Sequence, residues 1–153
     1  MLEYNISIIK TKLGNFFLKT QKKEIIYFRP FKGKASSGIN SFHIDIKNHI
    51  NLYILKKKEI LDFKCNPPGS CFQKKVWNEV KKIRYGRKKS YKDIAKILKT
   101  SPRAVGNACS TNPCLFFIPC HRVISNSGGL GGYVLGNNTK KELLSNESRK
   151  NIF

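Results

Sequence analysis

Acidic residues are scarce in this chain of 153 residues, which has nine Asp and Glu against thirty Lys and Arg and a formal net charge of +21. This imbalance favours a polyanionic partner, because each phosphate that a basic side chain neutralises releases counterions. A codon bias toward Lys, Asn and Ile is the alternative explanation. Residues 1–65 carry 13 basic and 5 acidic side chains, and residues 66–153 carry 17 and 4. The charge therefore indicates nucleic acid but does not locate the binding face.

Long apolar runs are also missing. No segment approaches the roughly 20 apolar residues that span a bilayer, and the N-terminal residues lack the order of a signal peptide. We therefore expect a protein that does not enter a membrane and that is cytoplasmic, or nuclear in a eukaryote. Ten Phe and 40% hydrophobic residues nevertheless predict a folded core.

Paired cysteine motifs are absent as well. The five cysteines contain no C-x-x-C pair, and their odd number in a chain without an export signal argues against a disulfide framework. We expect no metal site. The glycines between 128 and 132 let a planar ligand approach the backbone, although a mobile turn would show the same composition. They do not follow a strand and open a helix, so we expect no nucleotide cofactor.

The N-terminal part has the pattern of a small sheet followed by a helix. Residues 4–9 alternate between apolar and polar side chains, and apolar runs at 16–18 and 25–28 follow short polar turns. These runs predict three strands of an antiparallel meander. Apolar residues at helical spacing then predict a helix over 42–53.

The sequence Asn-Pro-Pro-Gly at 66–69 is the strongest interruption in the chain. Adjacent Pro and Gly residues end regular elements, because Pro lacks a backbone N–H and Gly adopts many conformations. We therefore place a domain boundary here, with a structural domain at 1–65 and a DNA-binding and catalytic domain at 66–153.

Three serines mark helix starts in the second part. Ser70, Ser90 and Ser101 each precede a run of helical periodicity, and Pro102 occupies the first helical position after Ser101. The last two helices are short and lie about three residues apart, which is the spacing of a helix-turn-helix. Many other helical hairpins have the same spacing, so the spacing alone leaves both interpretations open.

One cysteine has surroundings that suit a nucleophile. Leu115–Ile118 predicts a buried strand that Pro119 ends, so Cys120 emerges from an apolar element at a fixed angle. His121 and Arg122 follow directly, and neighbouring basic groups are the usual means of lowering the pKa of a thiol. A buried structural cysteine beside a surface histidine is the alternative interpretation.

Residues 118–123, Ile-Pro-Cys-His-Arg-Val, resemble the active-site signature of the O6-alkylguanine-DNA alkyltransferases, the methylated-DNA–protein-cysteine methyltransferases. Other motifs match in order and spacing: Ser90-Tyr91, Arg103-Ala104-Val105-Gly106, Asn112-Pro113, Gly131-Gly132-Tyr133 and Glu147. The resemblance covers residues 69–147, whereas 1–65 shows only the general layout of the family. It implies an α+β fold of two domains. The N-terminal domain would be a ribonuclease-H-like α/β domain with an antiparallel sheet, and the C-terminal domain would be mostly helical with a helix-turn-helix.

The resemblance also implies roles for five side chains. Cys120 would accept the alkyl group from O6 of guanine, His121 would take the thiol proton through a water molecule, and Glu147 would orient the imidazole. Asn112 would tie the active-site turn together, and Tyr91 would donate to the departing guanine. The thioether product is not cleaved by water, so each molecule would act once and without a cofactor.

The partner that the resemblance implies is double-stranded DNA containing O6-alkylguanine, bound by a monomer. The damaged base would be flipped out of the stack, because a buried thiol cannot reach it inside the duplex. Arg103 would fill the gap, and its helix would enter the minor groove. The residues expected at the DNA are Tyr91, Ser101, Arg103, Ala104 and Gly106, and those expected around the base are Val123, Gly131, Gly132, Tyr133 and Val134.

Three other functions are weighed against this interpretation. An alkyltransferase-like protein binds alkylated DNA on the same fold but lacks the acceptor cysteine, whereas Cys120 is present here. A plain helix-turn-helix regulator would leave the Pro-Cys-His-Arg run without a purpose. The alkyltransferase half of a fused transcriptional sensor would need a further metal-binding domain, for which we expect no room in 153 residues.

Overall fold

The computed structural model describes residues 3–148, and the chain divides into two compact units. The first unit holds the chain up to Pro68 together with Pro113–Phe117. The second unit holds Gly69–Asn112 and the chain from Ile118 onward. The sequence placed the boundary slightly earlier, after residue 65, and gave no sign that the short segment before Ile118 belongs to the first unit.

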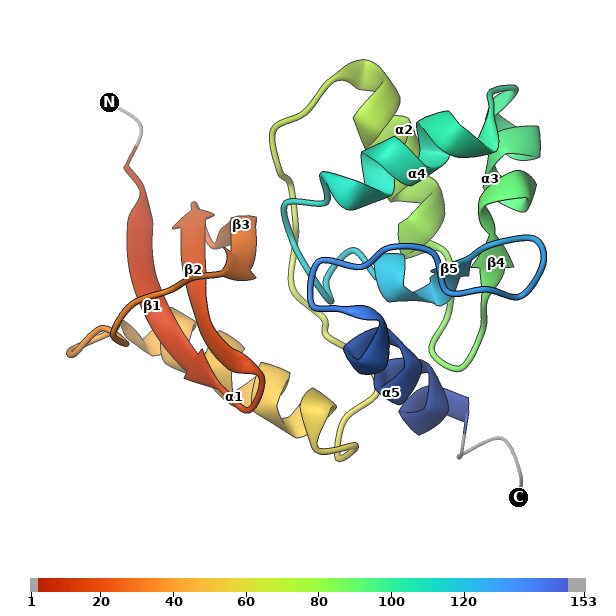
Figure 1. The fold of residues 1–153 in the computed structure, drawn as a ribbon. Coiled ribbons are helices and arrows are strands. Elements are labelled where there is room, and N and C mark those ends of the chain that lie inside the picture. Colours follow the sequence, from red (N-terminus) through yellow and green to blue (C-terminus); the bar gives the residue numbers. More distant parts are fainter. Residues whose placement is uncertain (1–2, 149–153) are drawn as a thin grey trace. The chain divides into compact units, whose positions relative to one another are not determined.

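The first unit contains a three-stranded antiparallel sheet in the order β1–β2–β3 (Figure 1). Its strands are β1 Asn5–Thr11, β2 Gly14–Gln21 and β3 Glu24–Pro30. Buried residues alternate with more exposed ones along β1 and β2, so one face of the sheet lies against a core. Lys22 and Lys23 join β2 to β3 with positive φ angles, as a two-residue hairpin turn requires. The predicted three-stranded antiparallel sheet is confirmed.

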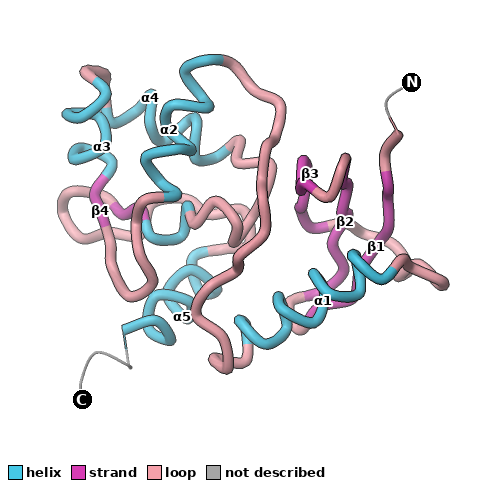
Figure 2. The backbone as a smooth tube through the Cα atoms, turned by 180° about the vertical axis from the view of Figure 1, so that it is seen from behind, coloured by secondary structure: helices cyan, strands magenta, loops and turns pink. Residues whose placement is uncertain are grey.

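Helix α1, residues Ser41–Ile54, packs against this sheet (Figure 2). Its buried side chains are His43, Ile46, Ile50 and Tyr53. Asn40 caps the helix by accepting a hydrogen bond from the His43 backbone N–H at 2.8 Å. The His43 ring is held by two hydroxyl groups, with Ser7 Oγ 2.5 Å from Nδ1 and Thr20 Oγ1 2.8 Å from Nε2. The polar ring is thus satisfied inside an apolar core.

The segment Pro113–Phe117 completes the core of the first unit. Cys114 forms an isolated parallel bridge with Phe28 of β3, and the Phe116 ring lies 6.3 Å from the Phe28 ring. The strand predicted over Leu115–Ile118 is wrong. Phe116 has a φ of 69°, which lies in the left-handed region and breaks an extended run.

The second unit is mostly helical (Figure 1). Its elements are α2 Cys71–Lys81, β4 Lys89–Ser90, α3 Tyr91–Leu98, α4 Pro102–Ser110, the 3-10 turn η1 Cys120–Arg122, β5 Val123–Ile124 and α5 Asn137–Ser148. The short strands β4 and β5 pair in parallel. Trp77 of α2 donates from Nε1 to the Ala108 carbonyl of α4 at 2.9 Å, which fixes these two helices to each other.

The helix starts predicted at three serines are confirmed. Ser70 and Ser90 each form a capping box, in which the serine hydroxyl and the side chain three residues later bond reciprocally to backbone N–H groups. Ser101 accepts from the Ala104 N–H at 3.1 Å, and Pro102 stands at the first helical position. Within residues 3–148, no helix is long and apolar enough to cross a membrane.

Candidate active site

Cys120 begins the turn η1 directly after Pro119, in the second unit. The Cys120 N–H donates to the Ile118 carbonyl at 2.8 Å, and Asn112 Nδ2 donates to the same carbonyl at 2.8 Å. Cys120 and Asn112 are both buried, with exposed fractions of 5% and 1%. Two hydrogen bonds to the Ile118 carbonyl therefore hold the turn that carries the thiol. The structure brings Cys120 and Asn112 together at this carbonyl.

Glu147, on α5, binds both residues that follow Cys120. His121 Nε2 lies 2.9 Å from Glu147 Oε1. Arg122 Nε donates to the two carboxylate oxygens at 3.1 and 3.0 Å, and its Nη1 donates to the Ile83 carbonyl at 2.8 Å. All three side chains of this cluster are buried. A guanidinium that reaches both oxygens compensates much of the free energy lost when the carboxylate leaves water.

These contacts decide which groups are charged. Burial by itself would raise the pKa of Glu147, but the hydrogen bonds from His121 and Arg122 outweigh it and lower that pKa to about 2. Burial lowers the pKa of His121 from its usual value, although Glu147 acts in the opposite direction. At neutral pH the carboxylate is ionised and the imidazole is neutral. A neutral imidazole that donates from Nε2 to Glu147 carries its accepting lone pair on Nδ1.

The Cys120 thiol is protonated at rest. A hydrogen bond with the Cys109 thiol of α4 and burial both raise the pKa of Cys120 well above its usual value. The sequence predicted the opposite, namely that His121 and Arg122 would lower it. That prediction is wrong because the imidazole is neutral and the guanidinium is bound to Glu147. The thiolate must therefore form during a reaction and is not present beforehand.

Tyr91 opens α3 and lies against two glycines. A Cβ added at Gly131 would come within 3.0 Å of Tyr91 Oη, and Gly131 has a φ of 68°, so a larger residue would be strained and crowded. A Cβ added at Gly106 of α4 would lie 4.0 Å from the tyrosine ring, which is an ordinary contact. Burial raises the pKa of Tyr91 to about 12. Its hydroxyl is therefore a stable hydrogen-bond donor.

A buried lysine adjoins Tyr91 and was not predicted from the sequence. Lys140 of α5 is fully buried, and its Nζ donates to the carbonyls of Val123, at 2.6 Å, and Leu130. The same Nζ lies 3.5 Å from Tyr91 Oη. Lys140 and Glu147 are seven residues apart and both are buried on α5. Because residues seven apart share a helix face, this spacing is the signal that could have revealed the lysine.

The other residues predicted to surround the base lie on β5 and the glycine-rich loop. Val123 is fully buried, Tyr133 is half-buried, and Gly131, Gly132 and Val134 are exposed. The Tyr133 ring lies 6.4 Å from the His121 ring. Its hydroxyl has no hydrogen-bond partner among residues 3–148. The structure thus brings Tyr133 to the imidazole and leaves the rest of the loop at the surface.

The residues predicted to contact DNA lie at the start of α4. Ser101 caps the helix, Arg103 is exposed in its first turn, and Ala104 and Gly106 are half-buried. Lys99, which ends α3, has a left-handed backbone with a φ of 54°. That conformation stops α3 and lets α4 begin three residues later, at Pro102. No predicted site residue falls outside the described part of the chain.

The chemical capacity of the site follows from the state of its groups. Among residues 3–148 no cluster of three or more His, Cys, Asp or Glu side chains could hold a metal ion. A protonated thiol, a neutral imidazole fixed by a carboxylate, and a tyrosine hydroxyl suit a nucleophilic displacement with general-base assistance.

Comparison with known proteins agrees with this chemistry. The model of the 6-O-methylguanine DNA methyltransferase family, DNA binding domain, matches residues 71–149. The chain is similar to a methylated-DNA–protein-cysteine methyltransferase of Methanocaldococcus jannaschii, with 47% identity over 153 residues, 95% of this chain and 89% of the relative. The protein of the same name in Methanocaldococcus vulcanius is 50% identical over 129 residues, 80% of this chain and 78% of the relative.

The solved structures give the same result for the fold. The crystal structure of Mycobacterium tuberculosis OGT in complex with DNA matches with a TM-score of 0.80 and 30% identity, covering 95% of this chain and 92% of that one. The chain therefore has the two-domain α/β fold of these structures. With the family match over residues 71–149 and relatives of this identity, the chain belongs to the 6-O-methylguanine DNA methyltransferase family.

Proposed function

We propose that the chain repairs DNA by transferring an alkyl group from O6 of guanine to the sulfur of Cys120. The observation that carries this proposal is the buried thiol on the same turn as neutral His121, whose Nε2 is bound to ionised Glu147. A nucleophile, a base and a group that orients the base are therefore present, as displacement by a thiol requires. The relatives named methylated-DNA–protein-cysteine methyltransferases and the DNA complex of the Mycobacterium protein support DNA as the substrate.

The first step is removal of the thiol proton. His121 Nδ1 accepts this proton through a water molecule, and the resulting imidazolium is stabilised by the carboxylate of Glu147 at 2.9 Å. Arg122 keeps that carboxylate ionised and in place. The sulfur of Cys120 then attacks the alkyl carbon, and the new C–S bond forms as the bond from carbon to O6 breaks.

The second requirement is stabilisation of the leaving guanine. Tyr91, with a pKa of about 12, is protonated and donates to the base as negative charge builds on it. Lys140 Nζ, 3.5 Å from the hydroxyl, stabilises the negative charge that then develops on Tyr91. Tyr91 gives its proton to the base, and the proton held by His121 returns to Tyr91 through solvent, so a thiol and an alkylguanine become a thioether and guanine. Because water does not cleave a thioether, Cys120 is used once.

DNA binding belongs to α3 and α4 in this proposal. The two helices act as a helix-turn-helix, and Arg103 enters the duplex from the minor groove as the damaged base flips into the pocket. The pocket is walled by residues 131–134, and the Val123 carbonyl, which already accepts from Lys140, has a second lone pair for the guanine amine. The first unit is a ribonuclease-H-like structural domain, and the protein acts as a monomer.

Weighing the protein after reaction tests the proposal. Incubation with an oligonucleotide containing O6-methylguanine is expected to add one methylene to the mass, and peptide mapping is expected to place it on Cys120. The variant Cys120→Ala should gain no mass. Cys109→Ala is the matched control, because it removes the neighbouring buried thiol and leaves the acceptor. Addition to Cys109, or to no residue, would contradict the proposed transfer.

The alternative is a protein that binds alkylated DNA without reacting with it. The presence of Cys120, His121 and Glu147 in one buried arrangement opposes this alternative, because binding alone needs none of their chemistry. An unchanged mass combined with tight binding of the O6-methylguanine oligonucleotide would establish the non-catalytic function instead.

A further inference from the structure

The sheet of the first unit has one face that α1 does not cover. Figure 1 shows the strands in front of α1, and Figure 2 shows the helix in front of the strands, so the helix lies on one side. Strand register places four cross-strand rows on the other side: Ile6–Lys19–Tyr27, Ile8–Phe17–Arg29, Lys10–Asn15 and Gln21–Glu24. We call these residues, with Phe31 after β3, the outer face. None of them is a buried core residue.

The outer face carries aromatic rings that remain accessible. Tyr27 is 38% exposed and Phe31 is 44% exposed, although both side chains are large and partly apolar. Both rings lie near Phe17, at centroid distances of 5.5 and 6.0 Å. Phe17, Lys19, Tyr27 and Phe31 are among the residues lining a depression of about 430 Å³. An uncovered group of rings of this kind marks a binding surface in soluble proteins.

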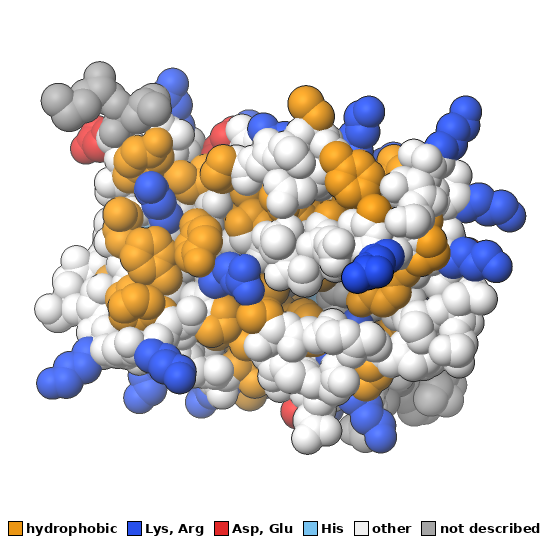
Figure 3. Space-filling view, turned by 45° about the horizontal axis from the view of Figure 1, so that its top comes forward, with side chains coloured by type: hydrophobic (Ala, Val, Ile, Leu, Met, Phe, Trp, Pro, Cys, Tyr) orange, Lys and Arg blue, Asp and Glu red, His pale blue; other side chains and the backbone are white. Residues whose placement is uncertain are grey.

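Basic side chains outnumber acidic ones on the outer face. Lys10, Lys19 and Arg29 lie on the same side as the rings, and Glu24, at the start of β3, is the one acidic residue of these rows. The carboxylate of Glu24 lies 3.4 Å from Asn66 Nδ2, which donates to it. Figure 3 shows Lys and Arg side chains among hydrophobic ones on the left of the view.

We propose that the outer face binds single-stranded DNA. Unpaired bases stack on Tyr27 and Phe31, while Lys19 and its basic neighbours contact the phosphates. Two features favour this partner over others. Accessible rings match the flat faces of bases, which a duplex does not expose, and a mainly basic rim repels a basic protein but attracts a polyanion. This site lies in the first unit, apart from the residues of α3 and α4 assigned above to duplex DNA.

Binding of a twelve-nucleotide oligothymidylate tests the proposal, since it contains no guanine and forms no duplex. The double variant Tyr27→Ala/Phe31→Ala is expected to bind it about tenfold or more weakly in fluorescence anisotropy at low salt. Its matched control, Tyr27→Phe/Phe31→Tyr, keeps both rings and should bind as the unchanged protein does. Both variants should keep the rate of methyl transfer, because neither residue belongs to the candidate active site.

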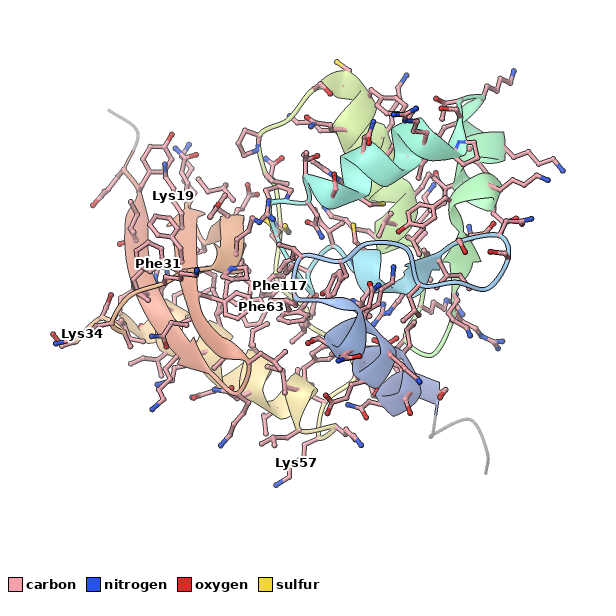
Figure 4. All side chains as sticks on the ribbon, in the orientation of Figure 1. Lys19, Phe31, Lys34, Lys57, Phe63 and Phe117 are labelled. Atoms are coloured by element: carbon pink, nitrogen blue, oxygen red, sulfur yellow. The ribbon has the colours of Figure 1, made fainter. Side chains whose placement is uncertain are left out.

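A second pair of variants tests the charge. Lys19→Ala should lower the slope of log affinity against log salt by about 0.7, the value for one phosphate contact on a single strand. Lys57→Ala removes the same charge beyond the end of α1, away from Lys19 (Figure 4), and should leave the slope unchanged.

Two binding results would overturn the proposal. One is equal affinity for oligothymidylate in the ring-removing variant and the unchanged protein. The other is loss of affinity for a DNA duplex as large as the loss for the single strand, which would make the surface a general basic patch. Crosslinking with a 5-iodouracil oligonucleotide should mark Tyr27 or Phe31, and crosslinks confined to α4 would also contradict it. None of these outcomes depends on whether Cys120 accepts an alkyl group.

Discussion

Each unit of this protein buries a histidine, and the two side chains differ in what holds them. His43 in the first unit is bound by the hydroxyl groups of Ser7 and Thr20. His121 in the second unit is bound by the carboxylate of Glu147. Burial lowers the pKa of both rings. A lowered pKa and complete burial therefore do not distinguish a structural histidine from a candidate base.

The partner makes the difference. Hydroxyl groups satisfy a neutral ring but offer little stabilisation to a charged one, so proton uptake by His43 would leave an uncompensated cation in an apolar core. A carboxylate beside His121 compensates that charge as it forms. Arg122 in turn prevents the carboxylate from taking the proton itself, because it holds the pKa of Glu147 at about 2. In the second unit an ionised carboxylate therefore stands ready to stabilise a protonated His121. In the first unit His43 has only neutral hydrogen-bond partners.

Replacing each histidine by glutamine is expected to give the largest separation between the units. His121→Gln should lower the single-turnover rate of methyl transfer by about 10²–10⁴-fold, the usual loss when a general base is removed. His43→Gln should leave that rate close to its original value and lower the free energy of unfolding by about 1–3 kcal/mol. Rapid-quench kinetics and urea unfolding measure the two effects. Equal losses of rate would remove the distinction between the two residues.

Replacing the carboxylate of Glu147 should destabilise the fold. Glu147→Gln leaves the guanidinium of Arg122 buried without its counter-ion, so the free energy of unfolding should fall by about 3–5 kcal/mol. Glu142→Gln is the control, because Glu142 lies on the same helix but is exposed, and it should cost less than about 0.5 kcal/mol. Urea unfolding at neutral pH compares them, and similar costs would mean that the buried pair does not stabilise the fold.

Acid should weaken the same contact by a smaller amount. The pKa of Glu147 is about 2 in the folded chain against an ordinary value of 4.5, a difference equivalent to about 3 kcal/mol. The folded pKa is lowered, so this stabilisation is complete above pH 4.5 and is lost as the pH falls toward 2. The stability difference between the unchanged protein and Glu147→Gln should therefore shrink by about 2 kcal/mol between about pH 6 and pH 3. If this stability difference stayed constant across the pH range, ionisation of Glu147 would not be its cause.

Local signals in the sequence were sufficient for many of the helices and strands. Ser70, Ser90 and Ser101 predicted helix starts because capping involves only the first helical turn, and each cap is present. Alternation of apolar residues predicted the meander for the same reason, since it reflects the two faces of a single strand. The fold of the second unit also includes α5, whose three buried residues, including Lys140 and Glu147, do not form an apolar pattern.

Contacts between residues far apart in the chain could not be predicted from the sequence. Nothing near Arg122 indicates that its guanidinium meets Glu147, 25 residues later. The contact between the thiols of Cys109 and Cys120 depends on how α4 packs against η1, which no periodicity reports. The proposed roles of Cys120 and Tyr91 came from resemblance to a family, and physical reasoning on the residues alone left Cys120 as one candidate among five thiols.

The path of the chain limits how this protein can be divided. Because the chain leaves the first unit at Pro68, returns for Pro113–Phe117 and leaves again before Ile118, no single cut yields the two units intact. A fragment beginning at Gly69 would carry Phe116 and its neighbours away from the core that buries them. The candidate active site is therefore not a portable module, and recombination that exchanges one unit must exchange the peptide leading to Cys120 with it.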